Sequence, residues 1–396
     1  MIYRLVLLLS AISFLAACGG GGGGVQPTVY PAISLSTSTS SLAENSGTTV
    51  TLTVTASKIS DEDITVTLST SGTATDGTDY SAVNGSSLTI TAGTTTATKT
   101  FTITDNSIYE GNETVIVAIS TVSGGSATEN GTQTETITIT ENESAPTITL
   151  STSTSSVAEN SGTIVTLTVT SSQAADEDIT VTLASSGTAT DGTDYSSVNS
   201  SSLTITTGTT TATKTFTITD NSIYEGNETI IVSINTVSGG GAAESETQTE
   251  TITITENESA PTVSIDVDGA TSASVYDNGS NLTLTATSTQ ISDEAITVVI
   301  GTSVGGATEG TDYAVISDIT IAAGATTGTA IFNPTADTVN EGSETETVSI
   351  TSVSGADSTT SGTSSISITI NEYALRTGTA FTEGTTAEQD TIKGRS

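Results

Sequence analysis

FTITDNSIYEGNET, residues 101–114, decides how this chain folds, because it returns letter for letter at 216–229 and in altered form at 332–345. Its first residues alternate, with Phe101 and Ile103 on one face and threonines on the other, which is the period of a β-strand. An acidic turn follows, and a second alternating run begins at its end. The stretch therefore predicts two strands joined by an acidic loop, in three copies.

The rest of the chain repeats with this stretch. Pro31, Pro146 and Pro261 follow one another at an interval of 115 residues, and the first two repeats align without a gap, whereas the third shows small shifts. Ungapped tandem copies indicate duplication of one folding unit. We therefore divide the chain into a signal peptide (1–18), a glycine-rich flexible tether (19–30), three repeats (31–145, 146–260 and 261–374) and a disordered tail (375–396).

Short alternating runs fill each repeat. In the second run of the first repeat, Val50, Leu52 and Val54 would face a core, while the threonines between them face water and keep a high strand propensity. Such runs, bounded by Gly, Asn, Asp and Ser clusters, are typical of sandwiches. We therefore predict an all-β protein of three tandem immunoglobulin-like antiparallel β-sandwiches. The seven strands expected in the first repeat span 32–36, 48–56, 63–70, 86–91, 96–104, 114–121 and 134–140.

Composition excludes several classes of function. The chain of 396 residues has a formal net charge of −37, so nucleic acid is not expected as a partner, since phosphate binding needs clustered Lys and Arg. It contains no His and a single Cys, which leaves no Ser/His/Asp set, no Cys/His pair and no disulfide. We therefore expect no enzyme and infer no small-molecule substrate. An acidic surface of this kind either solubilises the protein or attracts cations.

The leader carries the only cysteine. Residues 1–18 hold one positive charge, an apolar run and then small residues, as a secretory signal does. The ending LAAC, which closes on Cys18, resembles the bacterial lipobox, in which the cysteine is lipidated and becomes the new N-terminus. This resemblance implies a lipoprotein signal peptide and a membrane attached through a lipid anchor at Cys18. We expect the protein in the cell envelope, at the bacterial outer membrane or the cell surface.

Strand parity gathers the acidic residues at one end of each sandwich, which we call the acidic pole. In a sandwich of seven antiparallel strands with short connections, the loops after strands one, three and five share an end with the last residues of strand seven. The pole of the first repeat would therefore hold Glu44, Asp76, Asp79, Asp105, Glu110, Glu141 and Glu143, and that of the second Glu159, Asp191, Asp194, Asp220, Glu225, Glu256 and Glu258.

Four segments of the first repeat, taken together, resemble the Calx-beta family, the sandwich domains of sodium–calcium exchangers and of many bacterial surface proteins. These segments are LAENSG (42–47), GTATDGTDY (72–80), ITDNSIYEGNE (103–113) and ITITENE (137–143). The resemblance extends over all three repeats. It implies sandwich domains whose acidic pole binds Ca2+.

The resemblance also implies which residues bind the ion. In calcium-binding members the ligands come from a Glu of the first loop, an Asp before GTA, the acidic run and the later Glu of the fifth loop, and an acidic triplet at the chain exit. Ser71, Asn106 and Asn142 depart from that pattern, and the third repeat departs further, so we expect Ca2+ in repeats one and two only. The implied metal ligands are Glu44, Asp105, Glu110, Glu141 and Glu143, and Glu159, Asp220, Glu225, Glu256 and Glu258.

Three interpretations of function follow. The first is a membrane-anchored extracytoplasmic Calx-beta protein that binds calcium or is stiffened by it, and that acts in adhesion, cell communication, interaction or spacing with a protein or surface partner. The second is a periplasmic lipoprotein that responds to calcium or binds another ligand. The third is a passive acidic spacer without metal.

Overall fold

The computed structural model describes residues 29–303, 306–339 and 341–373, which form two compact units divided between Ser144 and Ala145. The predicted signal peptide, Cys18, all but the end of the tether, and the predicted tail lie outside the described residues. Within those residues the chain is built from β-strands and two short 3-10 turns, Glu44–Ser46 and Glu159–Ser161. No helix in this part of the chain is long and apolar enough to span a membrane.

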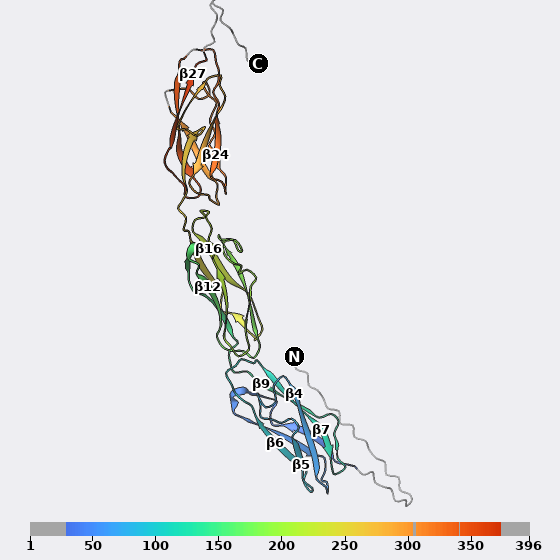
Figure 1. Cartoon of the computed structure of the whole chain (residues 1–396). Coiled ribbons are helices and arrows are strands. Elements are labelled where there is room, and N and C mark those ends of the chain that lie inside the picture. The colour runs from blue at the N-terminus through green and yellow to red at the C-terminus, as the bar shows by residue number, and fades with distance from the viewer. Residues whose placement is uncertain (1–28, 304–305, 340, 374–396) are drawn as a thin grey trace, which may run out of the picture. The chain divides into compact units, whose positions relative to one another are not determined.

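The first unit contains one sandwich of two sheets, as Figure 1 shows. One sheet has the order β6 (Thr96–Thr102), β3 (Thr49–Ala56), β1 (Ala32–Thr37) and β8 (Thr128–Glu129). The other has the order β2 (Ser41–Ala43), β9 (Thr134–Thr140), β7 (Glu113–Ser123), β4 (Ile64–Gly72) and β5 (Ser87–Ile90). All seven predicted runs therefore lie on strands of an all-β sandwich.

Two short parallel pairings accompany the antiparallel strands of the predicted sandwich. The first predicted strand is followed by a second short segment, β2, which crosses to the other sheet and pairs in parallel with β9. The short strand β8, also not predicted, pairs in parallel with β1. Both extra strands are only two or three residues long, so they show too little alternation to be recognised in the sequence. The crossing matters for function because it carries Glu44 to the exit of β9.

The core forms where the inner faces of the two sheets meet. Val50, Leu52 and Val54 are fully buried, as their alternation with threonine predicts. Tyr80 is also buried and packs edge-on against Phe101, with ring centroids 5.6 Å apart. An edge-to-face arrangement of this kind stabilises beyond the area that it buries. Tyr80, the last residue of GTATDGTDY, is thus a packing residue that fixes the loop between β4 and β5.

The second repeat, in the second unit, has the same topology and registers. Its first sheet has the order β15 (Thr211–Thr217), β12 (Ile164–Ser171), β10 (Thr147–Thr152) and β17 (Ala243–Glu244). Its second sheet has the order β11 (Ser156–Ala158), β18 (Thr249–Thr255), β16 (Glu228–Ser238), β13 (Ile179–Gly187) and β14 (Ser202–Ile205). A β-bulge interrupts the pairing of β13 with β16 between Thr182 and Leu183, and a matching bulge lies between Thr67 and Leu68 in the first repeat.

The third repeat keeps the same sheet order, but some residues of its core differ. Its sheets are β24 (Thr327–Phe332), β21 (Leu282–Ser288), β19 (Thr262–Val267) and β26 (Thr359–Thr360), and β20 (Ser272–Tyr276), β27 (Ser365–Asn371), β25 (Glu344–Ser354), β22 (Ile296–Thr302) and β23 (Ile319–Ile321). Tyr313 stacks on Phe332 here instead of meeting it edge-on. A carboxyl group, that of Glu346, enters the core at the position of Val115 and Ile230 and is fully buried.

Candidate metal centre

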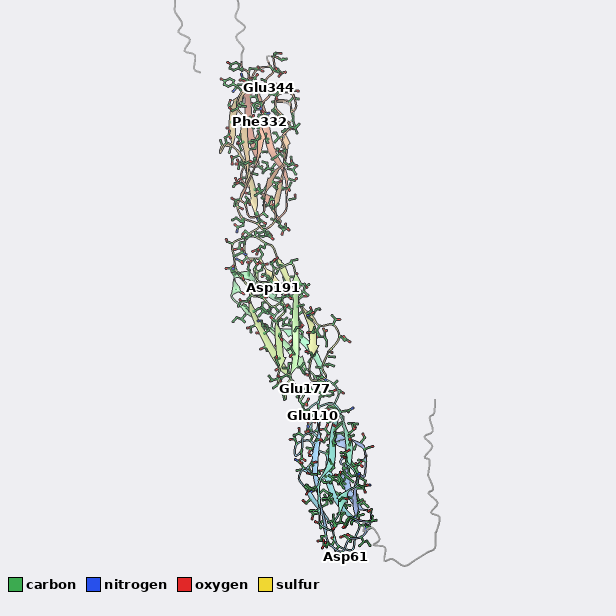
Figure 2. All side chains as sticks on the ribbon, turned by 90° about the vertical axis from the view of Figure 1, so that its right-hand side faces the viewer. Asp61, Glu110, Glu177, Asp191, Phe332 and Glu344 are labelled. Atoms are coloured by element: carbon green, nitrogen blue, oxygen red, sulfur yellow. The ribbon has the colours of Figure 1, made fainter. Side chains whose placement is uncertain are left out.

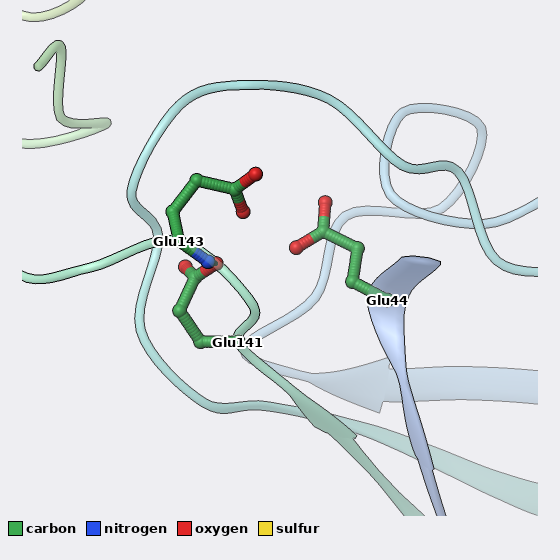
Figure 3. A group of neighbouring side chains, drawn as sticks. All are labelled: Glu44, Glu141 and Glu143. Carbon is green, nitrogen blue, oxygen red and sulfur yellow. Dashed lines mark hydrogen bonds between the residues drawn. The ribbon is translucent and has the colours of Figure 1, made fainter. Parts of the chain in front are cut away.

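The acidic pole of the first repeat brings three predicted ligands together. Glu44 starts the 3-10 turn after β2, and Glu141 and Glu143 follow the end of β9. Because β2 and β9 run in parallel, their ends lie at the same edge of the sheet. One carboxylate oxygen of each of the three residues lies within 4.8 Å of the others. Figure 3 shows the three side chains pointing toward one another.

Glu141 is held in place by main-chain donors. Its Oε2 accepts hydrogen bonds from the N–H groups of Glu110, at 2.6 Å, and Gly111, at 2.8 Å. Its Oε1 accepts from the N–H groups of Asn142 and Glu143, at 2.9 and 3.0 Å. Burial favours the neutral acid, but these bonds outweigh it and lower the pKa of Glu141. The carboxylate therefore stays charged and ties the fifth loop to the chain exit.

The carboxyl groups of Glu143 and Glu44 are less well compensated by hydrogen bonds than that of Glu141. The Glu143 Oε1 accepts a bond from the side-chain amide of Asn142 at 2.8 Å, whereas its Oε2 is buried and has no hydrogen-bond partner. Glu44 is 4% exposed, and burial, followed by the charges of Glu110 and Glu141, raises its pKa from 4.5 to about 7. Packed like charges of this kind store repulsion that a bound cation relieves.

A second carboxylate group lies at the same pole. It consists of Asp79, Glu110 and Glu113, again with one oxygen from each residue within 4.8 Å of the others. The buried Asp79 also accepts a 2.6 Å bond from the N–H of Thr75 and so closes the tight turn before Tyr80. The ligand prediction included Glu110 but missed Asp79 and Glu113. A signal for Glu113 was present, since it is the second acid of YEGNE and opens β7.

The remaining acidic residues of the pole play other parts. Asp105 is exposed and belongs to neither group of three. Asp76 accepts bonds at its Oδ2 from the N–H groups of Val83 and Asn84, at 3.1 and 2.8 Å, and from the Thr70 hydroxyl at 3.2 Å. Burial alone would raise the pKa of Asp76, but these donors outweigh it and lower that pKa. Asp76 is therefore a turn-stabilising residue, and its counterpart Asp191 has the same partners in kind.

The second repeat reproduces both groups. Glu159, Glu256 and Glu258 form the first, and the Glu258 Oε2 is again buried without a hydrogen-bond partner. Burial, followed by the charges of Glu256 and Glu225, raises the pKa of Glu159 to about 7. The second group contains Asp194, Glu225 and Glu228, while Asp220 is exposed and lies outside both.

The third repeat is more acidic at its pole than its sequence indicated. Asp312, Asp337 and Glu341 bring one oxygen each within 4.8 Å of the others, although Asp337 and Glu341 are exposed. These three residues line a small surface depression. Asp277, which stands at the position of Glu44, and Glu372 line it as well. The restriction of calcium to the first two repeats stays a prediction.

The chemistry of these donors fits a calcium ion. Ca2+ takes six to eight oxygen ligands, and carboxylates, amide oxygens and main-chain carbonyls all serve. The first groups of repeats one and two each supply three carboxylates from two chain segments, one of them with an unpartnered buried oxygen. None of the three lysines among the described residues, Lys58, Lys99 and Lys214, lies in the segments that form a pole.

Comparison with known proteins identifies the fold family. The model of the Calx-beta domain matches the chain three times, over residues 28–143, 141–258 and 264–373. The chain therefore belongs to the Calx-beta domain family, and the resemblance noted in the sequence is confirmed.

Solved structures to which the chain is similar include two structures of Calx CBD domains and an adhesin. CBD12 from CALX1.2 has 14% identity and a TM-score of 0.26 over 57% of this chain and 100% of that one. The apo-form Calx CBD1 domain has 19% identity and a TM-score of 0.25 over 28% of this chain and 99% of that one. The Yersinia pseudotuberculosis adhesin InvE has 15% identity and a TM-score of 0.25 over 60% of this chain and 62% of that one. No curated protein matches the sequence.

Proposed function

We propose that this chain is a calcium-binding, membrane-anchored extracytoplasmic protein that presents its Calx-beta repeats for adhesion, interaction or spacing at the cell surface. One observation carries the calcium assignment: in both of the first two repeats, an unpartnered buried carboxylate oxygen, of Glu143 or Glu258, lies within a group of three facing carboxylates. Burial of an uncompensated charge is costly, and a cation removes that cost. Calx-beta domains are calcium-binding modules, so membership of the family supports the same ion.

The support for a lipid anchor comes from the sequence alone. Cys18 ends a lipobox-like leader and is the only cysteine in the chain, so lipidation there would attach the protein to a membrane of the cell envelope. Loss of membrane association in a Cys18→Ser variant, measured by fractionation of expressing cells, tests this part. Unchanged association contradicts the anchor. The same proposal makes the protein a binding or spacing module and not an enzyme.

Thermal melting with and without calcium tests the metal site. Binding to the folded state alone adds about 2.7 kcal/mol of stability at 100 times the dissociation constant. We expect calcium to raise the melting midpoint more than magnesium does, and the rise to disappear when Glu141, Glu143, Glu256 and Glu258 are all changed to Gln. The matched control is Glu62→Gln, in the exposed loop between β3 and β4. In Figure 2 its neighbour Asp61 lies at the end of the first sandwich opposite Glu110.

The outcomes separate the three interpretations. An equal midpoint in calcium, magnesium and chelator favours a passive acidic spacer and rejects the metal site. A calcium-dependent change in far-UV or near-UV circular dichroism, beyond a shift of the midpoint, favours the calcium-responsive alternative. A shift of the midpoint with unchanged spectra supports the anchored module proposed here.

A further inference from the structure

Tyr224, in the fifth loop of the second repeat, is anchored in the third repeat. Its side chain is 8% exposed and belongs to a hydrophobic cluster whose other members all come from the third repeat, Ala356 among them. Its hydroxyl donates a 2.9 Å hydrogen bond to the carboxylate of Asp357. A buried tyrosine with a bonded hydroxyl fixes both the position and the direction of the segment that carries it.

The main chain on both sides of this ring is fixed as well. The Tyr224 N–H donates to the carbonyl of Ile291 at 2.8 Å, and its carbonyl accepts from the N–H of Asp293 at 3.3 Å. Together these bonds place Tyr224 beside Ser292 as an added parallel β-bridge. Ser292 is 2% exposed. The loop is therefore held by backbone pairing and by a buried side chain at the same point.

The next two residues belong to the candidate metal centre. The N–H groups of Glu225 and Gly226 donate to the Glu256 Oε2 at 2.7 and 2.9 Å. The docked tyrosine is therefore adjacent in the chain to the two donors that orient Glu256. Glu225 itself belongs to the second carboxylate group of the repeat. A displacement of Tyr224 must move these donors.

The third repeat also contributes charge to this neighbourhood. A cavity of about 210 Å³ is lined by Tyr224 and Glu225 from the second repeat and by Asp293, Glu294 and Asp357 from the third. Carboxylates that close on one another across the cavity add to the negative potential near Glu225. The docking of Tyr224 and the carboxylates of the third repeat therefore both favour cation binding at the second repeat.

We propose that Tyr224 is a positioning residue through which the third repeat sets the calcium affinity of the second. This inference rests on the proposed calcium binding, and it extends the site of the second repeat to residues that are not ligands. A loop already ordered by docking loses less conformational freedom when the ion binds, so the ion binds more tightly. Couplings between linked sites typically correspond to roughly fivefold to 150-fold in affinity.

The test measures calcium binding to the second repeat within the full chain. Glu141 and Glu143 are changed to Gln in every protein used, which removes the first-repeat site, and calcium is titrated by isothermal calorimetry. We expect Tyr224→Ala to raise the dissociation constant of the remaining site about tenfold and Tyr224→Phe to raise it about threefold. Tyr276→Ala, which removes an exposed tyrosine of the third repeat, is the matched control and leaves the constant unchanged.

A double-mutant cycle guards against a variant that fails to fold. Tyr224→Phe and Asp357→Asn each weaken the same hydrogen bond, so Asp357→Asn costs less affinity in the Tyr224→Phe background than in the parent protein. Additive effects, or an unchanged dissociation constant in Tyr224→Ala, overturn the positioning role while leaving calcium binding intact. Absence of calcium binding in the parent protein overturns the proposed function and this inference together.

Discussion

Replacing Glu346 by Ile, the residue of the second repeat at that position, is expected to stabilise the third repeat. The exposed fraction of Glu346 is 0%, and its Oε2 has no hydrogen-bond partner. Its Oε1 accepts from the N–H and hydroxyl of Ser303, at 2.6 and 2.8 Å, and from the N–H of Thr347 at 3.0 Å. Half of the carboxyl group is therefore buried without compensation.

The two N–H donors released by the substitution keep other partners, whereas the Ser303 hydroxyl and the buried Tyr313 hydroxyl each lose a hydrogen bond to Glu346. The Ser303 N–H also donates to the carbonyl of Thr347 at 3.0 Å, and the Thr347 N–H to the Ser303 hydroxyl at 3.3 Å. Leaving a polar atom buried and unpaired costs about 1–3 kcal/mol, and a buried isoleucine adds about 1.5–3 kcal/mol of apolar burial. After the loss of these hydrogen bonds, that of Tyr313 included, we expect a net gain of about 1 kcal/mol.

Hydrogen exchange measured on β25 and β27, together with calorimetric melting, reports on the third repeat within the full chain. A gain of about 1 kcal/mol raises the midpoint of a domain of about 100 residues by roughly 4–8 °C. The reverse change, Ile230→Glu, is the matched control and should destabilise the second repeat by more than about 3 kcal/mol. A lower midpoint for Glu346→Ile would refute the reasoning, because it would show that the carboxyl group contributes more than its burial costs.

Two further predictions concern the first repeat. Because the pKa of Glu44 is raised to about 7, the folded state holds a proton that the unfolded chain has released. The stability of the protein in chelator should therefore fall as the pH rises from about 4.5 to 7. Melting midpoints that rise over that window contradict this prediction. Gly72 has φ +121°, and a Cβ there would lie 2.1 Å from the carbonyl oxygen of Thr114, so Gly72→Ala should cost at least about 2 kcal/mol in denaturant unfolding. Gly77→Ala, at φ +86° with no atom within 4 Å of the added Cβ, should cost clearly less, and equal losses would reject the steric argument.

The sequence predicted the sandwich and its acidic pole because both follow from local alternation and from counting strands. Val50, Leu52 and Val54 are buried as that alternation requires, and Glu44, Glu141 and Glu143 meet as strand parity requires. Parity identifies an end of the molecule but not distances within it. The division of the pole into two groups therefore depends on side-chain placement that no spacing encodes.

The features that the sequence did not reveal depend on tertiary contacts. Strand parity placed Asp79 at the same pole as Glu110 but did not identify it as a ligand, and Glu113, which opens β7, joins both only through the fold. Glu346 looks like one more acid in an acidic chain until the register of β25 turns it inward. Tyr224 differs from Tyr109 in nothing local, since the same letters surround both, and its role comes from the repeat on which it docks.

The position occupied by Lys99 has a consequence for aggregation. β6 and β15 are edge strands, and Lys99 and Lys214 stand at the same register position in them, opposite Leu52 and Leu167. A lysine on an edge strand discourages the addition of a foreign strand, because its charge would have to be desolvated in the new sheet.

The third repeat lacks this protection. On its edge strand β24, Ala330 takes the lysine position, opposite Leu284, and the neighbouring Ile331 is 48% exposed. A free edge with apolar side chains is a template for intermolecular β-pairing. Of the three equivalent edge strands β6, β15 and β24, we therefore expect β24 to be the one along which concentrated protein associates first, and an Ala330→Lys substitution to block that association.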